Sequence, residues 1–139
     1  MHVETRLIAI PPDGVEKVAP LVQPHLGGVN ICSRGATDFM ATLELARQER
    51  AQLWVVAAQE GDIKASLMTE FVEYARATVC RVFCGGGEVE TIIEHLDELD
   101  EYARQGGAAI LEVDGPPWIR RALKVHFDLT RVTMTRRVR

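Results

Sequence analysis

Three strand-like segments in close succession, followed by three glycines and a long amphipathic segment, limit what this 139-residue chain can fold into more than any other feature. Residues 52–58 (QLWVVAA) are apolar, β-branched and aromatic, which is typical of a strand buried on both faces. A Gln-Glu-Gly-Asp turn leads to a second strand over 63–74, and a third covers 79–84. The pattern predicts an antiparallel meander in the middle of the chain.

The glycines at 85–87 end the third strand in a turn that leads into a helix. From Glu88 to Gln105 the apolar residues recur every three or four positions, which puts them on one helical face. They are Val89, Ile92, Ile93, Leu96, Leu99 and Ala103. Acidic side chains cover much of the remaining surface, so a single amphipathic helix is expected over 88–105.

The segments before the meander predict a strand and two helices. Residues 2–10 form the strand, which two prolines end. Asp13 is expected to cap the first helix, which Pro20 and Pro24 shorten or bend. Thr37 is expected to cap the second helix, which runs to about residue 50.

The segments after the long helix predict a strand over 108–113, a short helix beginning near Trp118 and a last strand over 129–138. No repeat or linker interrupts the chain. We therefore expect one α/β domain over residues 1–139, with the order β-α-α-β-β-β-α-β-α-β.

The composition indicates the class of protein and its expected location. With 47% hydrophobic residues and a net charge of -4, the chain matches an ordinary globular domain, and three cysteines are too few for a disulfide framework. No apolar run approaches the roughly 18 residues that span a bilayer, and no signal peptide begins the chain. We expect a reducing, intracellular location without membrane contact. Since the pI is near 5.6, nucleic acid is not an expected partner.

This order of elements resembles the GCN5-related N-acetyltransferase (GNAT) superfamily. Over residues 80–138 the chain is similar to a group of bacteriophage-encoded proteins of that fold. These carry a Gly-rich turn, a YAR-x-x-G helix end and a Gly-x-x-Trp motif, here residues 85–87, 102–107 and 115–118. The resemblance implies an acyl-CoA N-acyltransferase fold, with the host cytoplasm or the virus particle as the location.

Active members of the superfamily bind the pyrophosphate of acetyl-CoA on a Gln/Arg-x-x-Gly-x-Gly/Ala turn that caps the long helix. The resemblance gives as cofactor-binding candidates Val82, Phe83, Cys84, Gly85, Gly86 and Gly87. However, Val82 replaces the basic or amide residue, and Glu88 and Glu90 put two carboxylates in the positive field of the helix start. The acetyl-CoA site is therefore predicted to be degraded.

Catalytic candidates are few. Where the family often has a tyrosine acid on its penultimate helix, this chain has Ala122, four residues before His126. His126 is a candidate acid or base, with a surface or packing role as the alternative. The only local candidates for a base are Glu70, Glu73 and Tyr74, on the second meander strand. Because Glu70 and Glu73 are three residues apart, they point to opposite faces, so at most one lines a cleft. Solvated strand residues are the alternative.

The cysteines predict no special chemistry. Cys80 and Cys84 are four residues apart on a strand, which predicts the same face and a Cα separation of roughly 13 Å, too far for a disulfide. Histidines at 2, 25, 95 and 126 are scattered, so no metal site is expected. Core packing is the expected role of the two strand cysteines, and Cys32 has no neighbouring histidine to activate it.

Two interpretations of function remain. In the first, the protein is a binding or virion-assembly module without a cofactor, and it docks on a protein partner or a second copy through its acidic helix and basic C-terminus. In the second, it is an active acetyl-CoA-dependent N-acetyltransferase: the amides of residues 82–87 hold the cofactor, and Glu70 or Glu73 deprotonates an amine substrate through water. The basic C-terminus alone suggests a third class, a nucleic-acid-binding factor.

Overall fold

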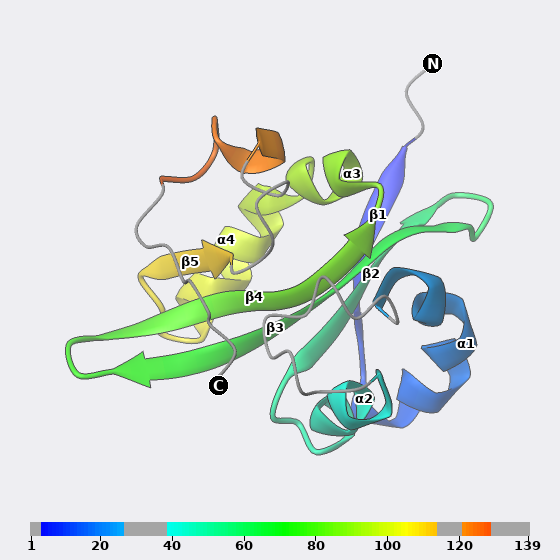
Figure 1. Ribbon diagram of the computed structural model, residues 1–139, viewed down its shortest axis with the longest axis horizontal. Coiled ribbons are helices and arrows are strands. Elements are labelled where there is room, and N and C mark those ends of the chain that lie inside the picture. Colours follow the sequence, from blue (N-terminus) through cyan, green and yellow to red (C-terminus); the bar gives the residue numbers. More distant parts are fainter. Residues whose placement is uncertain (1–3, 27–38, 114–120, 129–139) are drawn as a thin grey trace, which may run out of the picture.

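The computed structural model describes residues 4–26, 39–113 and 121–128, which form a five-stranded sheet with helices on both faces (Figure 1). The strands lie in the sheet in chain order: β1 (Thr5–Ile10), β2 (Gln52–Ala58), β3 (Ile63–Tyr74), β4 (Ala77–Gly87) and β5 (Ile110–Val113). Neighbouring strands are antiparallel except β4 and β5, which are parallel. The predicted mixed sheet with a central antiparallel meander is confirmed.

The helices form two pairs. A short 3-10 helix, η1 (Pro12–Gly14), and α1 (Val15–Leu26) follow β1, and α2 (Phe39–Arg47) precedes β2. The second pair, α3 (Val89–Ile93) and α4 (Leu96–Gln105), lies between β4 and β5 in the chain. The first pair covers one face of the sheet and the second pair the other (Figure 1). No helix in the described ranges is long and apolar enough to cross a membrane.

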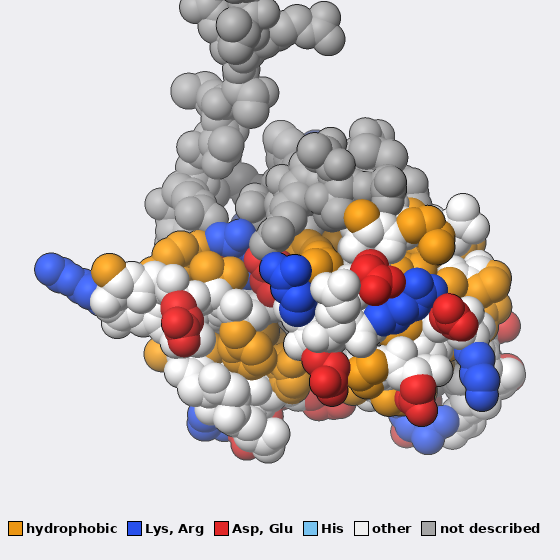
Figure 2. Space-filling model, turned by 90° about the horizontal axis from the view of Figure 1, so that it is seen from below, with side chains coloured by type: hydrophobic (Ala, Val, Ile, Leu, Met, Phe, Trp, Pro, Cys, Tyr) orange, Lys and Arg blue, Asp and Glu red, His pale blue; other side chains and the backbone are white. Residues whose placement is uncertain are grey.

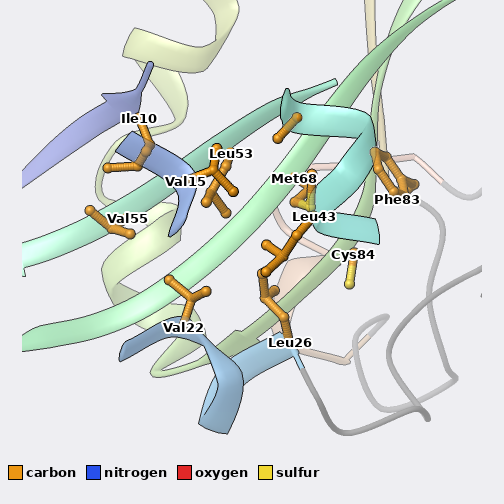
Figure 3. Packing of buried hydrophobic residues seen from close by; sticks show 11 residues of the cluster. Ile10, Val15, Val22, Leu26, Leu43, Leu53, Val55, Met68, Phe83 and Cys84 are labelled. Carbon is orange, nitrogen blue, oxygen red and sulfur yellow. The ribbon is translucent and has the colours of Figure 1, made fainter. Parts of the chain in front are cut away.

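Each face of the sheet has its own apolar core. Figure 3 shows the larger core, in which α1 and α2 pack on the sheet. Its fully buried members include Val15, Val22, Leu43, Leu53 and Met68. The smaller core, beneath α3 and α4, is built on Trp54, Leu67 and Leu99. The sheet therefore contributes side chains to both cores, as an alternating strand pattern requires.

The glycine run and the long helix differ from the prediction. Gly85, Gly86 and Gly87 belong to β4 and do not form a turn, because they continue its pairing with β3. The single helix expected over 88–105 is broken between α3 and α4. At the break, His95 is buried, and a 2.9 Å hydrogen bond joins its Nε2 to Oγ1 of Thr5 on β1. An apolar period alone does not reveal such an inward-facing polar side chain.

The first helical segment also differs in detail. Asp13 does not cap α1 but lies within η1, whose N-cap position is Pro11. Pro20 and Pro24 lie inside α1, which continues through both for 12 residues. Proline removes an amide donor without making helical φ inaccessible, and packing of the apolar face holds the helix despite the lost bonds.

Several predicted features lie outside the described residues. These are the start of the second helix at Thr37, Cys32, the Gly-x-x-Trp motif and the last strand over 129–138. Of the expected short helix after residue 118, the described residues 121–123 are helical.

A β-bulge separates the two strand cysteines. The β3–β4 register shifts between Met68 and Thr69, and Phe83 is skipped in the pairing. The extra residue reverses the alternation, so Cys80 packs beneath α4 whereas Cys84 joins the core beneath α1 and α2. The prediction that both cysteines share a face is therefore wrong. Burial raises the pKa of the Cys80 thiol to about 11, which keeps it protonated and unreactive at neutral pH.

Candidate functional site

The junction between β4 and α3 is where the family resemblance places a cofactor. β4 ends at Gly87 and α3 begins at Val89, so a single residue, Glu88, joins the strand to the helix. The Glu88 amide donates a 2.9 Å hydrogen bond to the carbonyl of Lys64 on β3. The first amide after the glycines is thus already used within the protein.

The glycines of this junction are required by close packing. A Cβ on Gly86 would lie 2.1 Å from the carbonyl oxygen of His25, near the C-terminal end of α1. A Cβ on Gly87 would lie 2.5 Å from the carbonyl oxygen of Lys64, and the φ of Gly87 is +93°, which favours glycine. A Cβ on Gly85 would make only ordinary contacts, at 3.5 Å. Two of the three glycines therefore let neighbouring backbone approach β4.

His25 is a residue of this junction that the sequence did not reveal. A 2.9 Å hydrogen bond joins its Nδ1 to Oγ of Ser66, which is fully buried on β3. Partial burial lowers the pKa of His25 below its usual 6.5, and the Glu88 carboxylate acts more weakly in the opposite direction. The imidazole is therefore neutral at pH 7. The contact joins residues 41 positions apart, so no local motif could have signalled it.

The acidic residues of the junction lie at the surface, as the sequence suggested. The side chains of Glu88 and Glu90 are exposed, and they occupy the N-cap position and the first turn of α3. α3 is only five residues long. Two carboxylates therefore lie at the start of α3, beside the partial positive charge of a short helix end.

The remaining cofactor-binding candidates are committed to the sheet and the core. Val82 pairs with Thr69 on β3 and with Val113 on β5, the last position at which the described β4–β5 pairing is seen. Phe83 and Cys84 are buried in the core beneath α1 and α2. Of the six cofactor-binding candidates at residues 82–87, Gly87 is exposed, whereas Val82 and Gly85 are partly buried.

Glu70 is tied into a charged cluster. Its carboxylate lies 3.8 Å from Nη1 of Arg81, whose Nε donates a 3.0 Å hydrogen bond to Glu112 on β5. Arg81 Nη2 also donates a hydrogen bond to the hydroxyl of Tyr74. The side chain of Glu70 is 7% exposed, so the expectation of a solvated strand residue is wrong for it. The pairing of Glu70, Arg81 and Glu112 across three strands explains its burial.

The other catalytic candidates lie apart from this cluster. Glu73 is exposed, whereas Glu70 is buried, which agrees with their predicted opposite faces. His126 is exposed just after the described helical residues 121–123, and its amide donates to the carbonyl of Leu123. Within the described ranges, the ion pair of Glu70 is with Arg81, and His126 is bonded through its amide to Leu123, so the catalytic candidates are not brought together. Within those ranges, no three His, Cys, Asp or Glu residues are grouped so as to hold a metal ion.

Comparison with known proteins identifies the fold. No protein-family profile and no curated protein matches the sequence. An aminoglycoside N-acetyltransferase, AAC(6')-Iy, solved in complex with CoA, matches at a TM-score of 0.68 and 13% identity, over 100% of this chain and 97% of its own. An acetyltransferase from Trypanosoma brucei matches at 0.63 and 13% identity, over 97% and 100%.

A ribosomal-protein-alanine N-acetyltransferase from Brucella melitensis biovar Abortus also matches at a TM-score of 0.63, with 10% identity over 98% of this chain and 99% of its own. This chain therefore has the fold of the GNAT acetyltransferases, as the order of elements predicted. At such low identity the likeness concerns the fold alone, and function has to be argued from the site.

Proposed function

We propose that this protein is a GNAT-fold binding module that does not use acetyl-CoA. The observation that carries the proposal is the one-residue junction between β4 and α3. A diphosphate needs several amides that converge on it, as a Gly-rich loop at a helix start supplies. Here the Glu88 amide is bonded to Lys64, and no loop remains between strand and helix.

The charge at the junction supports the same proposal. Glu88 and Glu90 are both exposed there, so a diphosphate would meet two carboxylates of its own sign. Under this proposal, the acetyl-CoA diphosphate does not fit this set of residues, and the protein catalyses no step through the cofactor.

A second support is that the described residues place no proton donor and base together. Ala122 has no proton to give to a departing thiolate. The carboxylate of Glu70 is buried and lies 3.8 Å from Nη1 of Arg81, so it is engaged in an ion pair within the protein. Glu73 and His126 are exposed candidates that nothing in the described residues places together.

An active N-acetyltransferase is the second candidate function. The match to a CoA complex over the whole of this chain favours it, and so does the neutral imidazole of His25 at the glycine end of β4. In this candidate the backbone of residues 82–87 holds the cofactor, and Glu70 or Glu73 accepts the amine proton through water. Glu88 and Glu90 would then have to be compensated by other groups.

Calorimetric titration with acetyl-CoA separates the two candidates. The module predicts no binding at about millimolar ligand, whereas the enzyme predicts micromolar binding. The double variant Glu88→Gln, Glu90→Gln should bind acetyl-CoA more tightly if these acids repel the diphosphate. The matched control, Asp97→Asn with Asp100→Asn on α4, makes the same change in net charge away from the junction. Micromolar binding by the unmodified protein would refute the module.

The partner of the module is proposed to be a protein. Figure 2 shows acidic and basic side chains interspersed on the face seen from below, without a field of one sign. Local contacts, and not long-range attraction, would therefore select a partner on that face. A role within a virus particle rests on the sequence resemblance, and purified particles that lack the protein would contradict it.

A further inference from the structure

The hairpin of β3 and β4 extends beyond the rest of the sheet (Figure 1). β2 begins at Gln52, which pairs with Thr69, whereas β4 accompanies β3 as far as Tyr74. Past Thr69, the side of β3 that β2 would occupy has no partner strand in the described ranges. Among the described residues, β3 therefore has an edge without a partner strand over residues 71–74, which is called the free edge below.

The turn of the hairpin determines which backbone groups face this edge. Two residues, Ala75 and Arg76, separate the paired residues Tyr74 and Ala77. In a two-residue hairpin the flanking pair exchanges both main-chain hydrogen bonds, and alternate residues along the strand face away from the partner. The main-chain donors and acceptors of Phe71 and Glu73 therefore point to the free edge.

The side chains at these two positions add a recognisable surface. Phe71 is 39% exposed although it is apolar, and its ring lies 5.4 Å from that of Tyr102 on α4. Glu73 is exposed, and no ion pair to it is found within the described ranges. Two residues apart on a strand, Phe71 and Glu73 point to the same face of the sheet.

A small pocket lies where the free edge meets the start of β2. Its volume is about 140 Å³, and Phe71, Tyr102, Arg50 and Gln52 are among the residues that line it. Glu49, Thr69 and Glu70 also line the pocket, so a side chain of a strand added beside Phe71 would meet both apolar and polar groups there. The edge thus combines unpaired backbone, an aromatic contact and a hollow for one side chain.

We propose that the free edge of β3 binds an extended segment of a partner protein as an added antiparallel strand. The segment carries a basic residue opposite Glu73 and, two positions later, an aromatic or branched aliphatic residue opposite Phe71. Main-chain hydrogen bonds give affinity, and the two side chains give specificity. This inference rests on the proposed binding-module function and specifies its partner class.

A second copy of this chain is less compatible with the edge. A copy that pairs about a two-fold axis at Glu73 would place like charges directly opposite each other, which destabilises a strand pair. A partner strand with complementary charge satisfies the β3 edge better than a second copy does.

The test uses a blocked hexapeptide, VTKTFT, titrated into the full chain and followed by NMR. We expect weak, saturable binding and slower hydrogen exchange of the amides of Phe71 and Glu73. Glu73→Gln removes the carboxylate but keeps the amide that faces the edge, whereas Glu73→Pro removes both. We expect Glu73→Pro to bind the peptide about tenfold or more weakly than Glu73→Gln does. Unchanged exchange at both amides would overturn the proposal. If the amides of Phe71 and Glu73 already exchange slowly in the absence of peptide, and sedimentation shows dimers, the edge is occupied by a second copy instead.

A charge swap tests the register. Glu73→Lys should weaken binding of VTKTFT and strengthen binding of VTETFT. If the substitution leaves the affinity for both peptides unchanged, the assigned register is wrong. These outcomes are independent of acetyl-CoA: cofactor binding with no peptide binding refutes both proposals, whereas binding of neither ligand refutes only this one.

Discussion

At the scale of single residues, the three glycines of β4 make different contacts. Gly86 lies under the carbonyl of His25, while Gly85 has room for a methyl group. We therefore expect Gly86→Ala to destabilise the protein by about 1–3 kcal/mol through overpacking against backbone, and Gly85→Ala to change stability by less than about 1 kcal/mol. Urea denaturation of both variants measures the difference. Equal stability would mean that α1 does not press on β4 at Gly86.

His25 makes the free energy of unfolding depend on pH. Because burial lowers its pKa in the folded state, the unfolded chain binds this proton first as the pH falls. The contribution of His25 to stability is therefore fully present above pH 6.5 and decreases as the pH falls below that value. The free energy of unfolding between pH 5 and pH 8 should fall less steeply towards acid in His25→Gln than in the unmodified protein. The exposed His126 provides the control, His126→Gln; an equal effect of both variants would refute the assignment.

At the scale of elements, Arg81 links three strands through Glu70, Glu112 and Tyr74. Arg81→Met removes a cationic partner from carboxylates that are 7% and 20% exposed, and a cost of about 3 kcal/mol is expected for breaking such a buried pair. Arg76→Met, at the exposed hairpin turn, should stay within about 0.5 kcal/mol. Thermal or urea unfolding compares the two. A small effect at Arg81 would show that the other contacts of Glu70 and Glu112 suffice.

Element types were predictable where one periodicity dominates. The strands at 52–58 and 63–74 have the predicted bounds, because their residues alternate or are uniformly apolar up to a clear turn. The break at His95 was not predictable, because it depends on a hydrogen bond to Thr5, 90 residues away. The bulge at Phe83 was hidden for a similar reason: only the register with β3 reveals it.

The candidate site was predictable in position but not in its contacts. The sequence placed the two acids at the start of a helix after the meander, and they lie there, but it placed the glycines in a turn, whereas they belong to β4. It missed that Gly86 and Gly87 pack against α1 and β3, and that His25 joins them. Long-range contacts decide whether a glycine serves a ligand or a neighbouring strand, and a local motif contains no such information.

At the scale of the whole molecule, one sheet separates two cores and belongs to both. Leu43 on α2 and Leu99 on α4 are both fully buried, on opposite faces. Because the same strands supply the opposing side chains, losing either core exposes the sheet to water, and the domain should unfold in one cooperative transition. Leu43→Ala and Leu99→Ala are each expected to cost about 2–5 kcal/mol.

The measurement for this last prediction needs one probe of the α3–α4 face and one of the whole backbone. Trp54 belongs to the core beneath α3 and α4, so its fluorescence in a Trp118→Phe background follows that face, while far-UV circular dichroism follows the whole backbone. Both probes should give the same midpoint in each variant, and both variants should shift it in the same direction. If Leu43→Ala lowers the dichroism midpoint but leaves that of Trp54 unchanged, the α1–α2 layer unfolds on its own. The binding edge of β3 would then belong to a sheet that survives without that layer.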